Sequence, residues 1–304
     1  MNAAVATSGM AIFFTLSGFL IANLLIQDDR PVPFLIHRLF RILPLAWVAM
    51  GLLALANRVD AWTVAANFFF FANLRPAHLM HGGEPLWSLC VEVQFYAGIA
   101  LIVALWGRRG LNIVPFAALT VTAWRIIETV PISIVTWERI DEILAGSTLA
   151  LFMSWLSRRQ RPLRIPNWTP VVLVALLLTS AHPSVPALPY LRPYFAAAAV
   201  GTSMLGAPGW IARILGSRPA RYIAEISYAL YVFHGMLAET WLGAIHESKV
   251  QRLLRLPLLL VATFALAHLS TFFYERRWIS LGKRLAAREM RSGGRIHSDE
   301  KAAI

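Results

Sequence analysis

The chain has 304 residues, of which 58% are hydrophobic and only 14% are charged. A soluble globular protein of this length needs more polar surface than this composition supplies, so the composition excludes that class and predicts a polytopic membrane protein. The formal net charge of +12 would fit a nucleic-acid-binding protein. However, the basic residues lie in short clusters between apolar runs, without a zinc-finger or RNP-like pattern, and we expect no nucleic-acid partner.

Nine apolar runs are long enough, or nearly so, to cross a lipid bilayer as helices. We therefore expect an all-α, polytopic integral-membrane bundle with about nine transmembrane helices. Four successive phenylalanines at residues 68–71 form a run too short to cross, which predicts an interfacial or re-entrant segment. The nine runs cover residues 9–26, 42–57, 86–106, 111–130, 140–157, 168–181, 190–207, 222–245 and 256–274.

The distribution of basic residues predicts the orientation of this bundle. If the C-terminus is cytoplasmic, the cytoplasmic side holds 20 of the 28 Lys and Arg residues, as the positive-inside rule requires. We expect residues 1–280 to form one membrane-embedded domain and residues 281–304 to form a basic, disordered cytoplasmic tail. Nine spans would then place the N-terminus outside, although residues 1–9 resemble no signal peptide. The odd number of spans, with no signal to export the N-terminus, predicts one further helix upstream of the given sequence.

Ionisable residues within the predicted spans mark candidate sites, because burying a charge in a bilayer is costly. Ser88, Glu92 and Tyr96 recur at i, i+4 and i+8 and would share one stripe of a helix. A packing hydrogen bond is the alternative, but a carboxylate is an expensive way to obtain one. Arg125 and Glu128, spaced i, i+3, are better explained as an ion pair than as catalytic groups.

Five motifs, taken in chain order, resemble those of the acyltransferase-3 family of bacterial integral-membrane O-acyltransferases. The pair Tyr274-Glu275 is similar to the family's terminal motif, although the motif's proline is absent. The resemblance therefore extends from Phe13 to Glu275. The motifs are FFTLSGFLI (13–21), HRLFRILP (37–44), WSLCVEVQFY (87–96), RIDEILAG (139–146) and ISYALYVFH (226–234).

The resemblance implies ten membrane helices, of which the given sequence begins at the second. The family's first helix carries an arginine and, eleven residues later, the histidine held to be catalytic, and neither occurs in the given sequence. We expect this helix upstream, hidden by a start codon assigned too late. Real truncation and loss of activity are the alternatives.

The resemblance also implies a reaction. An acyl group, usually acetyl, would pass from acyl-CoA as donor substrate to a hydroxyl of a cell-envelope or exported carbohydrate. The protein would act in the bacterial cytoplasmic membrane with no bound cofactor. A carbohydrate exporter and a non-catalytic assembly partner are the alternatives from other functional classes. The oligomeric state stays open.

Acyl transfer needs a base near the hydroxyl and an electropositive site for the phosphates of the donor. We predict Glu92 and His234 as catalytic candidates, although a packed histidine is the favoured explanation of His234. His37, Arg38 and Arg41 are predicted to bind the donor, with membrane topology as the competing explanation. No histidine pair has a metal-site spacing, so we expect no metal. Residues expected to line the cavity are Ser88, Gln94, Tyr96, Arg139, Asp141, Ser227, Tyr228, Tyr231 and Glu275.

Overall fold

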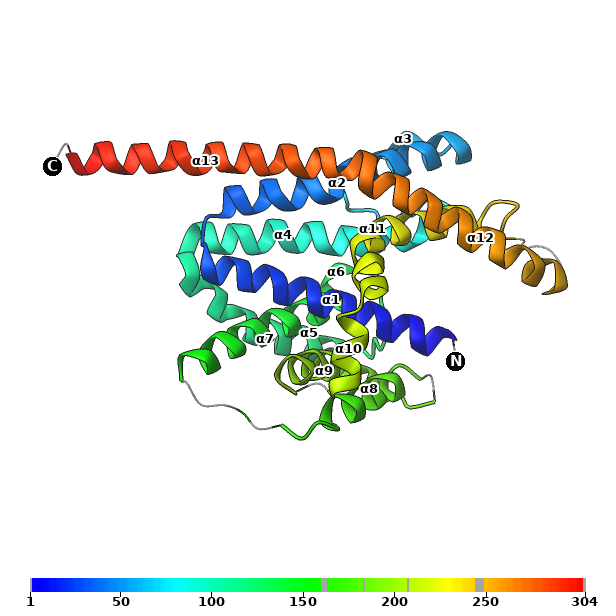
Figure 1. Ribbon diagram of the computed structural model, residues 1–304, viewed down its shortest axis with the longest axis horizontal. Helices are drawn as coiled ribbons and strands as arrows, with labels where there is room; N and C mark the ends of the chain where they lie inside the picture. Colours follow the sequence, from blue (N-terminus) through cyan, green and yellow to red (C-terminus); the bar gives the residue numbers. More distant parts are fainter. Residues whose placement is uncertain are drawn as a thin grey trace. The chain divides into compact units, whose positions relative to one another are not determined.

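The structure, a computed structural model, describes residues 2–159, 163, 165–182, 184–206, 208–243 and 249–302. Across these ranges all regular structure is helical and no strand is formed, which confirms the predicted all-α class (Figure 1). The chain divides into two compact units. The first unit comprises Met1–Pro31 and Ala97–Gly216, and the second comprises Val32–Tyr96 and Ser217–Ile304.

The first unit is built around α1 (Asn2–Gln27) and α7 (Asp141–Arg158), which pack against each other. A short 3-10 turn, η2 (Gly107–Ile113), leads from α4 (Trp87–Trp106) into α5. The other helices of this unit are α5 (Val114–Ile127), α6 (Thr136–Arg139), α8 (Thr169–Ser180), η3 (Leu188–Tyr190), α9 (Arg192–Gly206) and α10 (Gly209–Leu215).

Two motif glycines explain why α1 and α7 come so close. A Cβ atom on Gly18 would lie 1.9 Å from the carbonyl oxygen of Ile143, and one on Gly146 would lie 2.0 Å from that of Thr15. Small residues at such crossings let membrane helices pack backbone against backbone. The Ser147 hydroxyl adds a hydrogen bond of 3.0 Å to the Gly18 carbonyl. The glycines of the first and fourth motifs therefore have a packing role.

The second unit places α2 (Pro31–Asn57) with the first half of α4 and with α11 (Arg218–Ala238). A π-helical segment, η4 (Ser270–Glu275), interrupts the helical run formed by α12 and α13. The other elements of this unit are α3 (Ala61–Phe68), η1 (Glu84–Leu86), α12 (Lys249–Leu269) and α13 (Arg276–Ala302).

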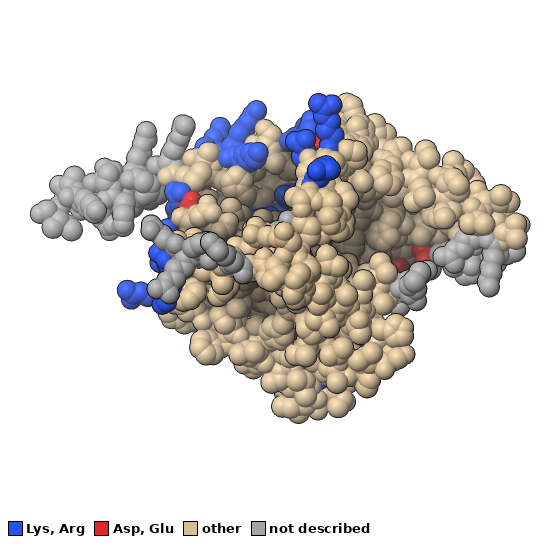
Figure 2. All heavy atoms as spheres, turned by 60° about the horizontal axis from the view of Figure 1, so that its bottom comes forward, with Lys and Arg blue, Asp and Glu red and all other residues tan. Residues whose placement is uncertain are grey.

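Each of the nine predicted spans overlaps a helix, but the number of spans stays a prediction. Four helical stretches among the described residues are long and apolar enough to cross a membrane, and a bent pair would make a fifth. Large apolar side chains such as Phe116 and Leu119 are exposed, as expected of helices that face lipid. Figure 2 shows a face on which most residues are neither basic nor acidic.

The structure differs from the sequence prediction in two helix bounds. α2 begins at Pro31 rather than at residue 42, so that Arg38 and Arg41 lie within the helix and not in a loop. Proline suits the first helical position because its missing N–H would be unpaired there in any case. α13 (Arg276–Ala302) covers most of the region for which a disordered tail was expected from residue 281.

Asp60 caps the start of α3, and its charge state should control that end of the helix. Its carboxylate accepts hydrogen bonds from the Trp62 and Thr63 amides at 2.9 and 3.0 Å and from the Thr63 hydroxyl at 2.6 Å. These bonds, the Thr63 hydroxyl first, lower the pKa of Asp60 below its usual range. A lowered pKa means that the cap is intact above the ordinary aspartate pKa of about 3.9 and is lost as the pH falls through the lowered value.

We expect Asp60→Ala to speed amide hydrogen exchange at Trp62 and Thr63 at neutral pH, because both amides lose their acceptor. Asp60→Asn is the matched control, since asparagine caps about as well as aspartate without the charge. Exchange at these amides that is equally slow in Asp60→Ala would show that the cap does not hold α3.

Candidate functional site

Four helical elements of the second unit bring motif residues together in a group that we call the polar cluster. It consists of Arg38 and Arg41 of α2, Glu92 and Tyr96 of α4, Tyr228 of α11 and Glu275 of η4. Arg38 interacts electrostatically with Tyr96, Arg41 and Glu92. Tyr228 interacts in the same way with Glu275, Glu92 and Tyr96, and Glu275 with Arg41. Four separate motifs of the sequence thus meet at one place.

Glu92 lies on the buried stripe that its spacing predicted. Ser88 is fully buried, and Glu92 and Tyr96 are only 4% and 2% exposed. A buried carboxylate needs compensation for the solvation that it loses, and Arg38 is a cation with which Glu92 interacts. α4 therefore carries a buried charge at Glu92, although the helix is otherwise largely apolar.

Glu275 is the second buried carboxylate of the cluster, at 5% exposed. It ends the π-helical segment and accepts hydrogen bonds of 3.0 Å from the hydroxyls of Ser270 and Thr271. Single π-helical turns within α-helices are frequent at functional sites. Nothing in the hydrophobic periodicity predicted this turn.

Tyrosines fasten α11 to the neighbouring elements of the second unit. The Tyr228 hydroxyl donates a hydrogen bond of 2.6 Å to the Ile42 carbonyl of α2. The Tyr231 hydroxyl lies 2.7 Å from the Ser88 hydroxyl and donates to the Pro85 carbonyl. Tyr231 and Ser88 thus link α11 to the start of α4.

The side chains of His234 and Ser227 are not part of the polar cluster. His234 is exposed, and its Nδ1 donates a hydrogen bond of 2.6 Å to the Tyr231 carbonyl of its own helix. Ser227 is also exposed, and its hydroxyl donates to the Ala224 carbonyl at 2.8 Å. Both side chains form hydrogen bonds within their own helix at exposed positions, whereas Glu92 and Glu275 are buried.

A basic group extends the cluster along α2 towards α13. His37 is exposed and interacts electrostatically with Lys283 of α13 and with Arg38. α13 reaches this position because it packs tightly on α2: a Cβ atom on Gly282 would lie 2.6 Å from the Cβ of Phe40. Sequence reasoning missed Lys283, because it assigned this lysine to a disordered tail.

Gln94 has a role in positioning a loop. Its amide nitrogen donates hydrogen bonds to the Phe70 carbonyl at 2.7 Å and to the Asn73 side chain at 3.1 Å. These bonds hold the turn that follows α3 against α4. The side-chain amide of Gln94 in the third motif is thus hydrogen-bonded within the protein.

Arg139 and Asp141 belong to the first unit, where buried ion pairs occupy them. Asp141 pairs with Arg125, which corrects the expected pairing of Arg125 with Glu128. Glu142 lies 2.8 Å from the Arg192 guanidinium and 3.3 Å from that of Arg139. All these ion-pair side chains are at most 3% exposed. The fourth motif thus supplies an internal charge network of the first unit.

Comparison with known proteins identifies the family. The model of the acyltransferase domain, acyltransferase 3, matches residues 1–272. The chain is 26% identical over 319 residues to the peptidoglycan O-acetyltransferase OatA of Listeria monocytogenes, a match that covers 88% of this chain and 50% of the relative. It therefore spans about half the length of that relative. No solved structure matches the chain.

Two further relatives are covered more completely. Nodulation protein 10 of Rhizobium leguminosarum bv. viciae is 24% identical, with 93% of this chain and 84% of the relative aligned. The exopolysaccharide production protein ExoZ of Rhizobium meliloti is 29% identical over 76% of both chains. Because the domain match covers residues 1–272, the chain belongs to the acyltransferase-3 family of integral-membrane proteins.

Proposed function

We propose that the protein is a membrane O-acyltransferase that moves an acyl group, acetyl in the first instance, from acyl-CoA to a hydroxyl of a cell-envelope or exported carbohydrate. The observation that carries this proposal is the polar cluster, which holds two buried carboxylates and two arginines on membrane helices. Helix packing alone needs no such costly groups. The names of two relatives, a peptidoglycan O-acetyltransferase and an exopolysaccharide production protein, support a carbohydrate acceptor.

In this reaction the acceptor oxygen forms an ester bond to the acyl carbon while the thioester C–S bond breaks. The proton of the hydroxyl passes to a base, which returns it to the departing sulfur, so that CoA leaves as the thiol. A neutral alcohol is a weak nucleophile, so the loss of the base should lower the rate of acyl transfer strongly. The resemblance gives this role to a histidine of the upstream helix; within the given sequence Glu92 is the candidate, because it is a buried carboxylate that interacts with an arginine of the proposed donor site. Tyr228, which interacts with both carboxylates, would help to shape the same space.

The donor would bind at the basic group of His37, Arg38, Arg41 and Lys283. The phosphates of CoA are anionic, and arginine binds phosphate through a planar fork of N–H donors. In the orientation that the positive-inside rule favours, this end of α2 faces the cytoplasm, where acyl-CoA is found. This orientation, with a cytoplasmic C-terminus in the bacterial cytoplasmic membrane, is part of the proposal.

We expect Arg38→Ala and Arg41→Ala each to raise the KM for acetyl-CoA by about tenfold to a hundredfold. A charge-assisted hydrogen bond to phosphate contributes about 1.5 to 3 kcal/mol. Lysine should rescue only part of the loss, since it lacks the fork. The assay follows labelled acetyl transfer from acetyl-CoA to envelope carbohydrate by the reconstituted protein.

Arg58→Ala is the matched control, because Arg58 is exposed just beyond the opposite end of α2. It removes the same charge from the same segment without touching the basic group. Unchanged KM values in both Arg38→Ala and Arg41→Ala, with normal yield, would show that these arginines serve topology alone. A non-catalytic exporter would give no labelled product in any variant.

A further inference from the structure

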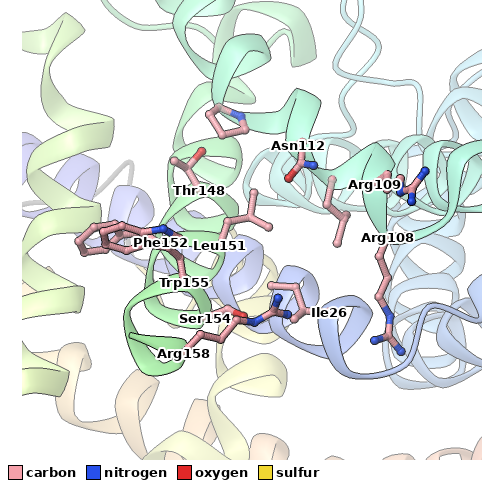
Figure 3. A pocket seen from close by; sticks show the side chains of 12 residues that line it. Ile26, Arg108, Arg109, Asn112, Thr148, Leu151, Phe152, Ser154, Trp155 and Arg158 are labelled. Carbon is pink, nitrogen blue, oxygen red and sulfur yellow. The ribbon is translucent and has the colours of Figure 1, made fainter. Parts of the chain in front are cut away.

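The first unit contains a cavity of about 700 Å³ that the polar cluster does not use (Figure 3). It lies where η2 and the first turn of α5 meet the end of α1 and the last turns of α7. Three arginines, Arg108, Arg109 and Arg158, line it together with apolar and aromatic side chains from α7. Asn112, Thr148 and Ser154 supply further polar groups.

The charge of this cavity is only partly neutralised by the protein. Arg108 donates a hydrogen bond to the Gln27 carbonyl and lies 3.4 Å from the Asp29 carboxylate. Arg109 and Arg158 are exposed, and neither forms an ion pair or a hydrogen bond with any residue that the structure describes. The neighbouring carboxylate of Asp28 is already paired with Arg30 at 2.6 Å. Two cations thus remain available to an anionic ligand.

An aromatic pair borders the arginines. The rings of Phe152 and Trp155 stack with their centroids 5.8 Å apart, and the Arg159 guanidinium lies 4.3 Å above the Trp155 ring. Tryptophan beside arginine is typical of the level at which a membrane helix meets the lipid headgroups. This end of α7 therefore has the chemistry of a membrane interface.

The cavity continues into an apolar groove. A second space of about 470 Å³ shares Pro115, Thr148 and Phe152 with the first and runs between α5, α7 and α9. Its other walls are nearly all apolar, among them Leu119, Leu149, Met153 and Ala198. A basic, polar cavity thus continues into an apolar groove. A ligand that fills both must be amphiphilic.

We propose that this cavity and groove bind an anionic glycerophospholipid of the bilayer. Its phosphate would lie at Arg109 and Arg158, and an acyl chain would occupy the groove beside Leu119 and Ala198. A soluble phosphate compound would leave the apolar groove unfilled, and a neutral lipid would leave the two arginines unpaired. Basic pockets between membrane helices recognise anionic headgroups in this way.

The placement of the arginines supports a lipid of one leaflet. The positive-inside rule predicted that the loops after the third and fifth apolar runs lie on the same side of the membrane. The structure brings the arginines of both loops to one cavity, together with the end of α1. A ligand that contacts all three segments therefore binds at a single membrane surface.

The experiment measures binding of phosphatidylglycerol and phosphatidylcholine of equal chain length to the delipidated, detergent-solubilised full chain by native mass spectrometry. We expect the wild type to prefer phosphatidylglycerol. Arg109→Ala combined with Arg158→Ala should weaken that binding by about 25-fold, from about fivefold for each arginine near an anionic surface. The corresponding double lysine variant should retain most of the affinity, because the charge is kept.

Arg213→Ala combined with Arg218→Ala is the matched control, since it removes two exposed arginines that do not line the cavity. A second variant, Ala198→Trp, narrows the groove and leaves every arginine in place, and it should also weaken phosphatidylglycerol binding. Monodisperse elution of each variant checks that it is folded.

Equal phosphatidylglycerol binding by the wild type and the double alanine variant would overturn the proposal. So would displacement of the lipid by glycerol phosphate or by CoA at the same concentration, because a soluble anion would then be the ligand. Normal binding by Ala198→Trp would remove the apolar groove from the site and overturn the proposal in its present form. Acyl transfer enters none of these measurements.

Discussion

Glu92→Gln is expected to reduce acyl transfer by about 100-fold to 10,000-fold while the protein still folds and inserts. The substitution keeps the size of the side chain and part of its hydrogen bonding, but it removes the charge that a base needs. The loss of a positioned general base typically costs this much in rate. Glu92 is 4% exposed and interacts electrostatically with Arg38, so its charge is part of the polar cluster. Labelled acetyl transfer, normalised to monodisperse protein, gives the rate.

The control is Glu84→Gln, which removes a carboxylate from the exposed turn η1 just before α4. His234→Gln tests the other catalytic candidate. Full activity in Glu92→Gln would contradict the catalytic assignment, because hydrogen bonds between membrane helices average about 0.6 kcal/mol and an amide would replace the packing role of the carboxylate. If His234→Gln alone lost the activity, the base would be His234.

The elements that the sequence predicted well are those set by local spacing and hydropathy. Apolar runs mark helices because a bilayer leaves the backbone no other way to satisfy its hydrogen bonds. The i, i+4 recurrence of Ser88, Glu92 and Tyr96 fixed which face of α4 is buried, since successive turns of a helix bring these positions into line.

Contacts between residues far apart in the chain were beyond such reasoning. The helical spacing rule favoured Glu128 as the partner of Arg125, whereas the structure pairs Arg125 with Asp141, 16 residues away. Glu142 and Arg192 are separated by 50 residues. The helical tail was missed for a similar reason: its basic composition predicts disorder, but packing of Gly282 on Phe40 supplies the tertiary contact that a helix of this kind needs.

Asp141 offers the clearest test of whether the charge network of the first unit serves stability. Asp141→Leu would leave the guanidinium of Arg125, which is fully buried, without its carboxylate. Removing one partner of a buried ion pair typically destabilises a protein by about 3 to 5 kcal/mol, because the remaining charge is uncompensated. We expect a marked fall in the thermal unfolding temperature in detergent and in the yield of monodisperse protein.

The double variant Arg125→Met with Asp141→Leu decides the cause of that fall. It removes both charges at once, so it should be more stable than Asp141→Leu alone, since an apolar pair avoids the cost of burying a lone cation. Recovery should be incomplete, because Arg125 also donates hydrogen bonds to the carbonyls of Val130 and Pro131 at 3.2 and 2.6 Å. If Asp141→Leu unfolded at the wild-type temperature but lost acyl transfer, Asp141 would instead contact substrate, and the network of the first unit would belong to the reaction site.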